Sequence, residues 1–298
     1  MVRVDVLKRL AQLNKGALKY TSADKPADPN MDRGGNPAVC EPALRIRGEQ
    51  VKLITLEEAV PGIVTQDTGG EFLLIKRRFS DIITHSSKLI KPFRDISGTK
   101  NQLFINAFAL NNTTGAGGVH PSKLLFLDIE TCGLTNAPLF LIGTAYFTGE
   151  DFVVLQLFAR SFCEERPLLS FFTKLITQYD MLISFNGRSF DVPFIISRGQ
   201  QYRIDIPTAL LHIDLLFKAR ELWGRTLPDC KLQTIERHIL GRTRTGDIPG
   251  SKIPDVYSEF VQTGNAALIQ RVLEHNTLDV ITMIEIVGMI LTYKQHNP

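Results

Sequence analysis

The sequence predicts a three-layer α/β fold, in which a mixed sheet of five to six strands is flanked by helices and a small β-rich region lies on its N-terminal side. The first observation is a series of short apolar runs in residues 121–160, which is typical of three consecutive buried strands. The second is the alternation of helical and strand-like segments that follows, since this order indicates an α/β sheet. The third is the helical periodicity of the last 70 or so residues.

The bulk composition indicates a protein with a well-buried core. Of the 298 residues, 44% are hydrophobic and 22% are charged, which is close to globular averages and argues against disorder of the whole chain. The formal net charge of +3 is too small to indicate a polyanionic partner by itself. The four cysteines are widely spaced and form no CxxC pair, which argues against a zinc site and against a disulfide framework.

Three regions are expected along the chain. Residues 1–45 combine an N-terminal amphipathic helix with a proline-containing linker. Residues 46–118 are expected to form a small appended β-rich region, because apolar runs such as FINAFAL look like strands. Residues 119–295 form the main domain. The N-terminal helix lacks the unbroken apolar core of a signal peptide, and no segment approaches the roughly 20 apolar residues that span a bilayer, so a cytoplasmic location without membrane contact is expected.

The main domain is expected to begin with a strand at LLFLDIE, residues 124–130, followed by a hairpin whose two strands flank the turn TGED. A helix over about 164–178 then leads to the buried strand MLISFN, and a second helix beginning near Ser189 leads to the strand in TALLHIDLL. Three further segments are helical by periodicity, with Asp229 and Asn265 as expected caps of the first two. Asp214 is expected to cap the helix after the last strand.

Asp128 and Glu130 are two positions apart in the first strand, so their side chains share one face of the sheet while Leu127 and Ile129 share the other. Two carboxylates beside an apolar strand repel each other, and buried unpaired charge is costly. The sequence has no Lys or Arg between Leu124 and Ala159. Bound cations are therefore the simplest expected compensation.

Two more acidic positions follow the same logic. Asp191 comes after the strand MLISFN, at the start of a helix and near the carboxyl end of the sheet, where α/β proteins bind ligands. A plain preference of Asp for helix N-termini explains it equally well. His275 and Asp279 are four apart, so on a helix they lie on one face. His275 could accept a proton from a water at neutral pH, although such pairs more often lie on a helix surface without a catalytic role.

Four carboxylates without cysteine favour Mg²⁺ or Mn²⁺ over zinc. Two such ions about 3.5 to 4 Å apart can activate a water and stabilise the leaving oxygen of a phosphodiester. The sequence lacks a GxxxxGKS loop, which argues against a kinase or an ATPase.

These residues carry a resemblance to a known family. The segments DIET (128–131), FNGRSFD (185–191) and HNTLD (275–279) resemble the three exonuclease motifs of the DEDD superfamily, which includes DnaQ-like exonucleases and polymerase proofreading domains. With DIPGSKIPDVY (247–257), they are similar to the YprB-like ribonuclease-H-like domain family over about residues 121–293. The resemblance implies a ribonuclease-H-like fold and a metal-dependent 3′-to-5′ exonuclease that acts on the 3′ end of single-stranded DNA or RNA.

The resemblance also implies roles for single residues. Asp128, Glu130, Asp191 and Asp279 would bind two divalent cations, Mg²⁺ or Mn²⁺, and His275 would act as the general base. In the family's tyrosine subgroup a Tyr lies four positions before the last Asp, and in its histidine subgroup a His lies five positions before it. His275 lies four positions before Asp279, so it has the spacing of the first subgroup and the chemistry of the second. Substrate contacts are implied more weakly for three residues that would also serve as core or turn residues: Leu134 and Phe190, which would pack on the terminal nucleotide, and Asn186, which would order the site.

Two basic segments have open interpretations. Lys76, Arg77 and Arg78 with Lys88, Lys91 and Arg94, interleaved with Phe79 and Phe93, would contact phosphates if they face one way, or form a solvated surface. The loop containing Arg242, Arg244 and Lys252 has the same two interpretations. The alternative to an exonuclease is a nucleic-acid-binding or scaffolding module with a weak or silent nuclease site, and an endonuclease with the same fold is a further possibility. No motif predicts a protein partner or distinguishes DNA from RNA.

Overall fold

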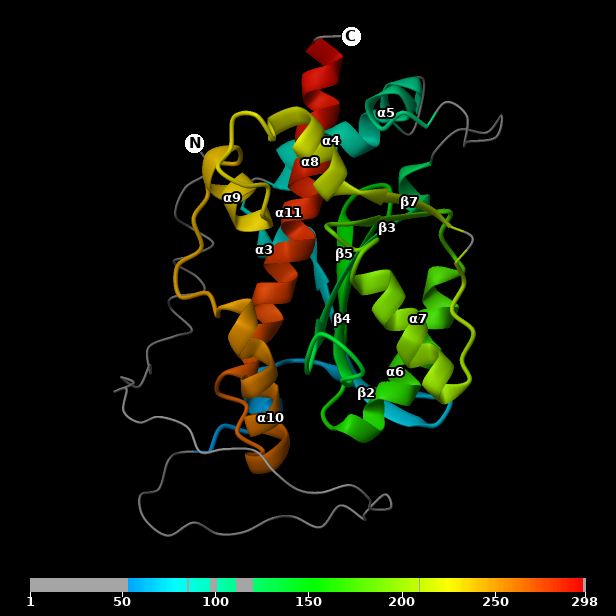
Figure 1. Cartoon of the computed structure of the whole chain (residues 1–298), viewed down its shortest axis with the longest axis vertical. Coiled ribbons are helices and arrows are strands. Elements are labelled where there is room, and N and C mark those ends of the chain that lie inside the picture. The colour runs from blue at the N-terminus through cyan, green and yellow to red at the C-terminus, as the bar shows by residue number, and fades with distance from the viewer. Residues whose placement is uncertain (1–52, 85, 97–100, 111–119, 209, 297–298) are drawn as a thin grey trace.

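The computed structural model describes residues 53–296 except for 85, 97–100, 111–119 and 209. The expected helix and linker at 1–45 lie outside these residues. In the described part, seven strands form one mixed sheet in the order β1-β2-β5-β4-β3-β6-β7 (Figure 1). Their bounds are β1 Ile63–Asp67, β2 Gly70–Arg78, β3 Leu124–Thr131, β4 Leu139–Phe147, β5 Phe152–Phe158, β6 Met181–Ser184 and β7 Leu211–Asp214.

Strand β3 is central to the arrangement. It pairs antiparallel with β4 on one side and parallel with β6 on the other, and β6 pairs parallel with β7. The hairpin β4–β5 turns at Gly149, whose φ of +99° favours glycine, and β2 continues the sheet antiparallel to β5. The predicted α/β class with a mixed sheet between helices is confirmed.

Helices cover both faces of the sheet (Figure 1). Their bounds are α2 Leu56–Ala59, α3 Phe79–Ile82, α4 Ser86–Ile96, α5 Asn101–Ala107, α6 Glu165–Ile176, α7 Asp191–Tyr202, α8 Leu215–Trp223, α9 Leu232–His238, α10 Ile253–Thr263 and α11 Ile269–His296, with 3₁₀ turns at Pro121–Lys123, Phe162–Glu164 and Gly250–Lys252. One apolar core contains buried residues of α6, α7 and α10, and a second contains those of α4, α5 and the C-terminal half of α11. The two cores lie on opposite faces of β3. Leu125 and Leu127 belong to the first core, whereas Leu124 and Phe126 belong to the second.

Two expectations about the N-terminal part are wrong. The sheet has seven strands, not five to six, because β1 and β2 join it through the pairing of β2 with β5 and do not form a separate region. The region is also mainly helical after β2: the apolar run at 104–110, expected as a strand, begins inside α5. A short apolar run alone does not distinguish a buried strand from a buried helix. Here the run begins in a helix that packs on α11.

The last two helical segments of the sequence form the single helix α11. Its portion Ile269–Tyr293 is long and apolar enough to cross a membrane, contrary to the expectation that no segment approaches that length. However, 67% of its most apolar window is buried inside the fold, and the helix packs on β3, β4, β5 and α4. Long apolar helices of this kind also occur as core helices of globular proteins, and α11 has that position.

Candidate functional site

Strand β3 presents Asp128 and Glu130 toward α11. Leu127 and Ile129 lie on the opposite face and are buried in the core with α6 and α7, as the alternation of a strand requires. A register irregularity between Glu130 and Thr131 ends the regular pairing with β4. The two carboxylates therefore stand at the end of a central strand, and both are only partly exposed.

Asp191 reaches the same place from the other side of β3. It is the first residue of α7, is 5% exposed, and its Oδ1 accepts a hydrogen bond of 3.2 Å from the backbone N–H of Ile129, between the two acidic residues of β3. The preceding loop is held by Asp214, which accepts the N–H groups of Asn186 and Arg188 and caps α8 through the N–H of Leu216. The expected capping role of Asp214 is confirmed, and the same carboxylate positions the loop that delivers Asp191.

Helix α11 supplies His275 and Asp279 from one face, one turn apart. His275 Nε2 lies 3.5 Å from Asp279 Oδ2, and one ligand atom each of Glu130, His275 and Asp279 lie within 4.8 Å of one another. Asp128 and Asp191 are close enough to Asp279 to interact with it electrostatically. The structure thus brings together the five residues predicted for metal binding and catalysis, and we call Asp128, Glu130, Asp191 and Asp279 the carboxylate cage.

The electrostatics of the cage show that its charges are not fully compensated by the protein. Burial, reinforced by the charges of Asp279, Glu130 and Asp191, raises the pKa of Asp128 well above its usual value. Burial raises the pKa of Glu130 to about 8 and that of Asp191 to about 7, and burial also raises the pKa of Asp279 despite nearby Arg244 and His275. Carboxylates with such pKa values favour a bound proton or a bound cation at neutral pH.

The protein does supply one cation that the local sequence could not show. Arg244, 4% exposed, donates from Nη2 to Asp279 Oδ1 and to Glu236 Oε1, and its Nη1 lies 3.2 Å from Asp247 Oδ2. Arg242 contacts Glu236 and Glu285, both at 3.0 Å. The sequence left two interpretations of this loop, a solvated surface and a phosphate-binding segment. Neither applies to Arg242 and Arg244, because both pair with acidic side chains inside the fold.

A buried chain of polar side chains supports the other side of the cage. Asn276, fully buried, donates from Nδ2 to Asp128 Oδ2 at 2.8 Å and accepts from Gln156 Nε2 at 2.8 Å. Gln156 in turn accepts from Arg77 Nη2 at 2.9 Å. We call Arg77, Gln156 and Asn276 the polar relay. It links β2 through β5 and α11 to Asp128, so the N-terminal part of the sheet contributes to the site.

Sequence reasoning missed Asp247, Arg244 and the polar relay as neighbours of the cage. Signals existed for two residues: Asp247 opens the segment DIPGSKIPDVY, and Asn276 lies inside HNTLD. Arg77 was part of the predicted basic cluster, which does not face one way: Arg77 points inward to Gln156, whereas Lys91 pairs with Asp95 at 2.7 Å. Phe79 and Phe93 of that cluster are core residues.

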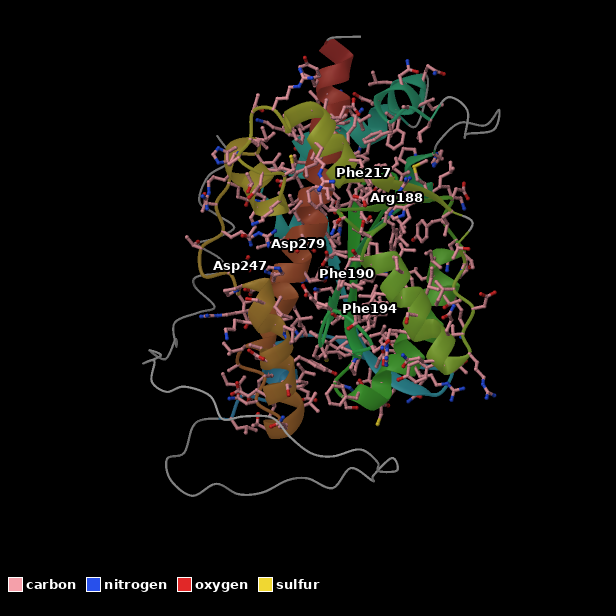
Figure 2. All side chains as sticks on the ribbon, in the orientation of Figure 1. Arg188, Phe190, Phe194, Phe217, Asp247 and Asp279 are labelled. Atoms are coloured by element: carbon pink, nitrogen blue, oxygen red, sulfur yellow. The ribbon has the colours of Figure 1, made fainter. Side chains whose placement is uncertain are left out.

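The three residues with weaker site predictions lie in the loop after β3 and in the turn before α7. Leu134, in the loop after β3, is 81% exposed. Phe190 immediately precedes Asp191, and its ring lies 5.5 Å from that of Phe194 (Figure 2). Asn186 is exposed and adopts a left-handed backbone with φ of 65° in the turn before α7. Their roles in substrate binding stay predictions.

Three comparisons relate the chain to known proteins. The model of a family described as the RNase_H superfamily matches residues 125–291. The uncharacterized protein YprB of Bacillus subtilis (strain 168) is 31% identical over 188 residues, a match that covers 61% of this chain and 45% of YprB, so the chain corresponds to less than half of that relative. Among solved structures, a family B DNA polymerase from the hyperthermophilic archaeon Pyrobaculum calidifontis aligns with a TM-score of 0.46 and 16% identity, over 59% of this chain and 25% of the polymerase.

Proposed function

This chain belongs to the ribonuclease H superfamily, and from that membership and its carboxylate cage we propose that it is a metal-dependent 3′-to-5′ exonuclease that hydrolyses phosphodiester bonds of single-stranded DNA or RNA. The observation that carries the proposal is the convergence of four carboxylates from β3, α7 and α11 in a partly buried place where their pKa values are raised. Such an arrangement is costly without a positive partner. Of these four carboxylates, Arg244 pairs with Asp279.

The donor set fits two divalent cations. Hard carboxylate oxygens without thiolates suit Mg²⁺ and Mn²⁺, and members of this superfamily usually bind divalent metals. When bound, two such ions lower the pKa of a water and stabilise negative charge on the leaving 3′ oxygen. The residues of the chain that would hold them are Asp128, Glu130, Asp191 and Asp279. His275 adjoins the cage, where its Nε2 either accepts a proton from the attacking water or binds a cation.

A direct assay tests the proposal. The purified chain is incubated with Mg²⁺ or Mn²⁺ and with single-stranded DNA and RNA oligonucleotides labelled at the 3′ end, and labelled mononucleotides are expected as the first products. A closed circular single strand serves as the matched control and should survive, because an exonuclease needs an end. Cleavage of the circle would indicate an endonuclease, and binding without any product under either metal would favour a binding module with a silent site.

Cation-dependent stability gives a second test that needs no substrate. Because the folded-state pKa values of Asp191 and Glu130, about 7 and 8, exceed those of unfolded carboxyls, folding of the metal-free chain takes up protons. Its stability should therefore fall as pH rises from 6 to 8. Mg²⁺ or Mn²⁺ at about 100 times its Kd should raise Tm by about 5 °C at pH 8 and by clearly less at pH 6, where protons already neutralise the cage.

This prediction is measured by thermal denaturation with and without EDTA. The control is a monovalent salt at matched ionic strength, which should not reproduce the effect. An equal increase of Tm at both pH values, or none, would contradict cation binding to the cage.

A further inference from the structure

His275 is held at both nitrogens of its ring. Nδ1 lies 2.8 Å from Asp247 Oδ1, and Nε2 faces Asp279 Oδ2 at 3.5 Å. A carboxylate oxygen this close to Nδ1 accepts a hydrogen bond when that nitrogen carries the proton. In the neutral imidazole, the lone pair is then on Nε2 and points toward the cage.

The geometry around Nε2 matches a mixed nitrogen and oxygen ligand set. One ring nitrogen of His275 and one carboxylate oxygen each of Glu130 and Asp279 lie within 4.8 Å of one another, and Nε2 is the nitrogen that lies 3.5 Å from Asp279 Oδ2. A divalent ion with bonds of about 2.0–2.2 Å needs neighbouring ligand atoms about 3 to 4 Å apart. Small side-chain rotations therefore suffice. His275 and Asp279 are also one helical turn apart on α11, which places both donors on one side of a single rigid element.

A second layer of contacts fixes these donors. Arg244 occupies the outer oxygens: its Nη1 lies 3.2 Å from Asp247 Oδ2, and its Nη2 donates to Asp279 Oδ1. The inner oxygens, Asp247 Oδ1 and Asp279 Oδ2, are those that face His275. Figure 2 shows Asp247 on the segment that runs beside α11, on which Asp279 lies. A carboxylate behind a histidine is the arrangement that orients metal-bound imidazoles.

We propose that His275 binds a divalent cation through Nε2, with Glu130 and Asp279 as the other protein ligands and Asp247 as the residue that orients the imidazole. This rests on the proposed function, since it places a nitrogen donor in the same cage, and it deepens that function in two ways. The site should prefer a first-row transition metal such as Mn²⁺ over Mg²⁺, which keeps to oxygen ligands. A cation-bound Nε2 also has no lone pair left to act as the general base.

Pulsed electron paramagnetic resonance of Mn²⁺ tests the ligand directly. The full chain is loaded with one equivalent of Mn²⁺, and modulation from a directly bound ¹⁴N nucleus is expected. It should vanish in His275→Gln and persist in His238→Gln, a matched control because His238 is exposed on α9. Labelling of the unmutated chain with ¹⁵N-histidine, which should change the modulation frequencies, provides the same readout if His275→Gln fails to fold.

Calorimetric titration supplies the matching affinities. We expect the unmutated chain to bind Mn²⁺ at least about tenfold more tightly than Mg²⁺, and Asp247→Asn to weaken Mn²⁺ binding by about 10-fold to 100-fold, as for other residues that orient a metal ligand. Mg²⁺ affinity should change by less than about threefold in His275→Gln. Similar losses for both metals would contradict a nitrogen ligand.

The outcomes separate this inference from the proposed function. Mn²⁺ binding without nitrogen modulation, or no Mn²⁺ binding at all, overturns the inference. Nuclease activity without nitrogen modulation overturns the inference but not the proposed function, and His275 is then expected to act as the general base. Nitrogen modulation in a chain that releases no nucleotide from any oligonucleotide supports the inference and overturns the proposed exonuclease activity.

Discussion

Asp128→Asn is expected to reduce the rate of nucleotide release by at least about a thousandfold, which corresponds to about 4 kcal/mol of transition-state stabilisation. The change removes one negative charge from the cage but keeps the shape of the side chain and an oxygen that can accept the hydrogen bond from Asn276. Cations are then held by three carboxylates only, and metal-ion catalysis contributes several kcal/mol. Initial rates on a 3′-labelled oligonucleotide at saturating Mn²⁺ measure the effect.

The same variant should be more stable than the unmutated chain without metal at pH 8. The pKa of Asp128 is raised by burial and by three neighbouring carboxylates, so its charge opposes folding. Loss of activity together with a higher metal-free Tm separates a missing ligand from a damaged fold. The control is Asp255→Asn, an exposed carboxylate on α10 that pairs with Lys252 at 3.5 Å, and its rate should not change. Activity of Asp128→Asn within tenfold of the unmutated chain would exclude the proposed mechanism.

Gly143→Ala is expected to disrupt the polar relay. A Cβ atom at position 143 would lie 2.1 Å from Asn276 Oδ1, far inside contact distance. Asn276 cannot move aside at little cost, because it is fully buried and binds both Gln156 and Asp128. Overpacking of this kind costs about 1 to 3 kcal/mol. Because Asp128 loses its hydrogen-bond donor at the same time, we expect at least a tenfold lower rate of nucleotide release.

Urea denaturation without metal measures the stability loss, and rates are compared at a temperature at which both proteins are folded. Gly250→Ala is the matched control, because a Cβ there meets no atom within 4 Å. Arg77→Gln tests the relay from its far end and should weaken activity in the same direction, though less. If Gly143→Ala lowers stability but leaves the rate unchanged, the relay supports the fold and does not position Asp128.

Local patterns in the sequence predict much of this arrangement. A period of two in LLFLDIE places Asp128 and Glu130 on one face, and a spacing of four places His275 and Asp279 on one helical face. The order of strands and helices after residue 121 predicts that Asp191 lies at the carboxyl end of the sheet. These inferences need only backbone periodicity, and the structure agrees with each of the predicted positions.

Contacts between distant residues could not be predicted in this way. The pairing of β2 with β5 joins residues about 80 positions apart, and the side chains of Arg77 and Gln156 are hydrogen-bonded across these two strands. The absence of Lys and Arg near Asp128 suggested that only bound ions compensate the acids, yet Arg244 reaches Asp279 from 35 positions away. Asn276 contacts Asp128 across 148 positions. Ion pairs and hydrogen bonds between residues so far apart in the chain produce no periodic pattern in the local sequence, so they could not be predicted from it.

The most direct test of the central claim is a crystal structure of the chain grown with Mn²⁺, in which anomalous scattering locates the ions. Two peaks about 3.5 to 4 Å apart are expected, surrounded by carboxylate oxygens of Asp128, Glu130, Asp191 and Asp279. Peaks only at other positions, or side chains of the four acids turned away from a common centre, would contradict it.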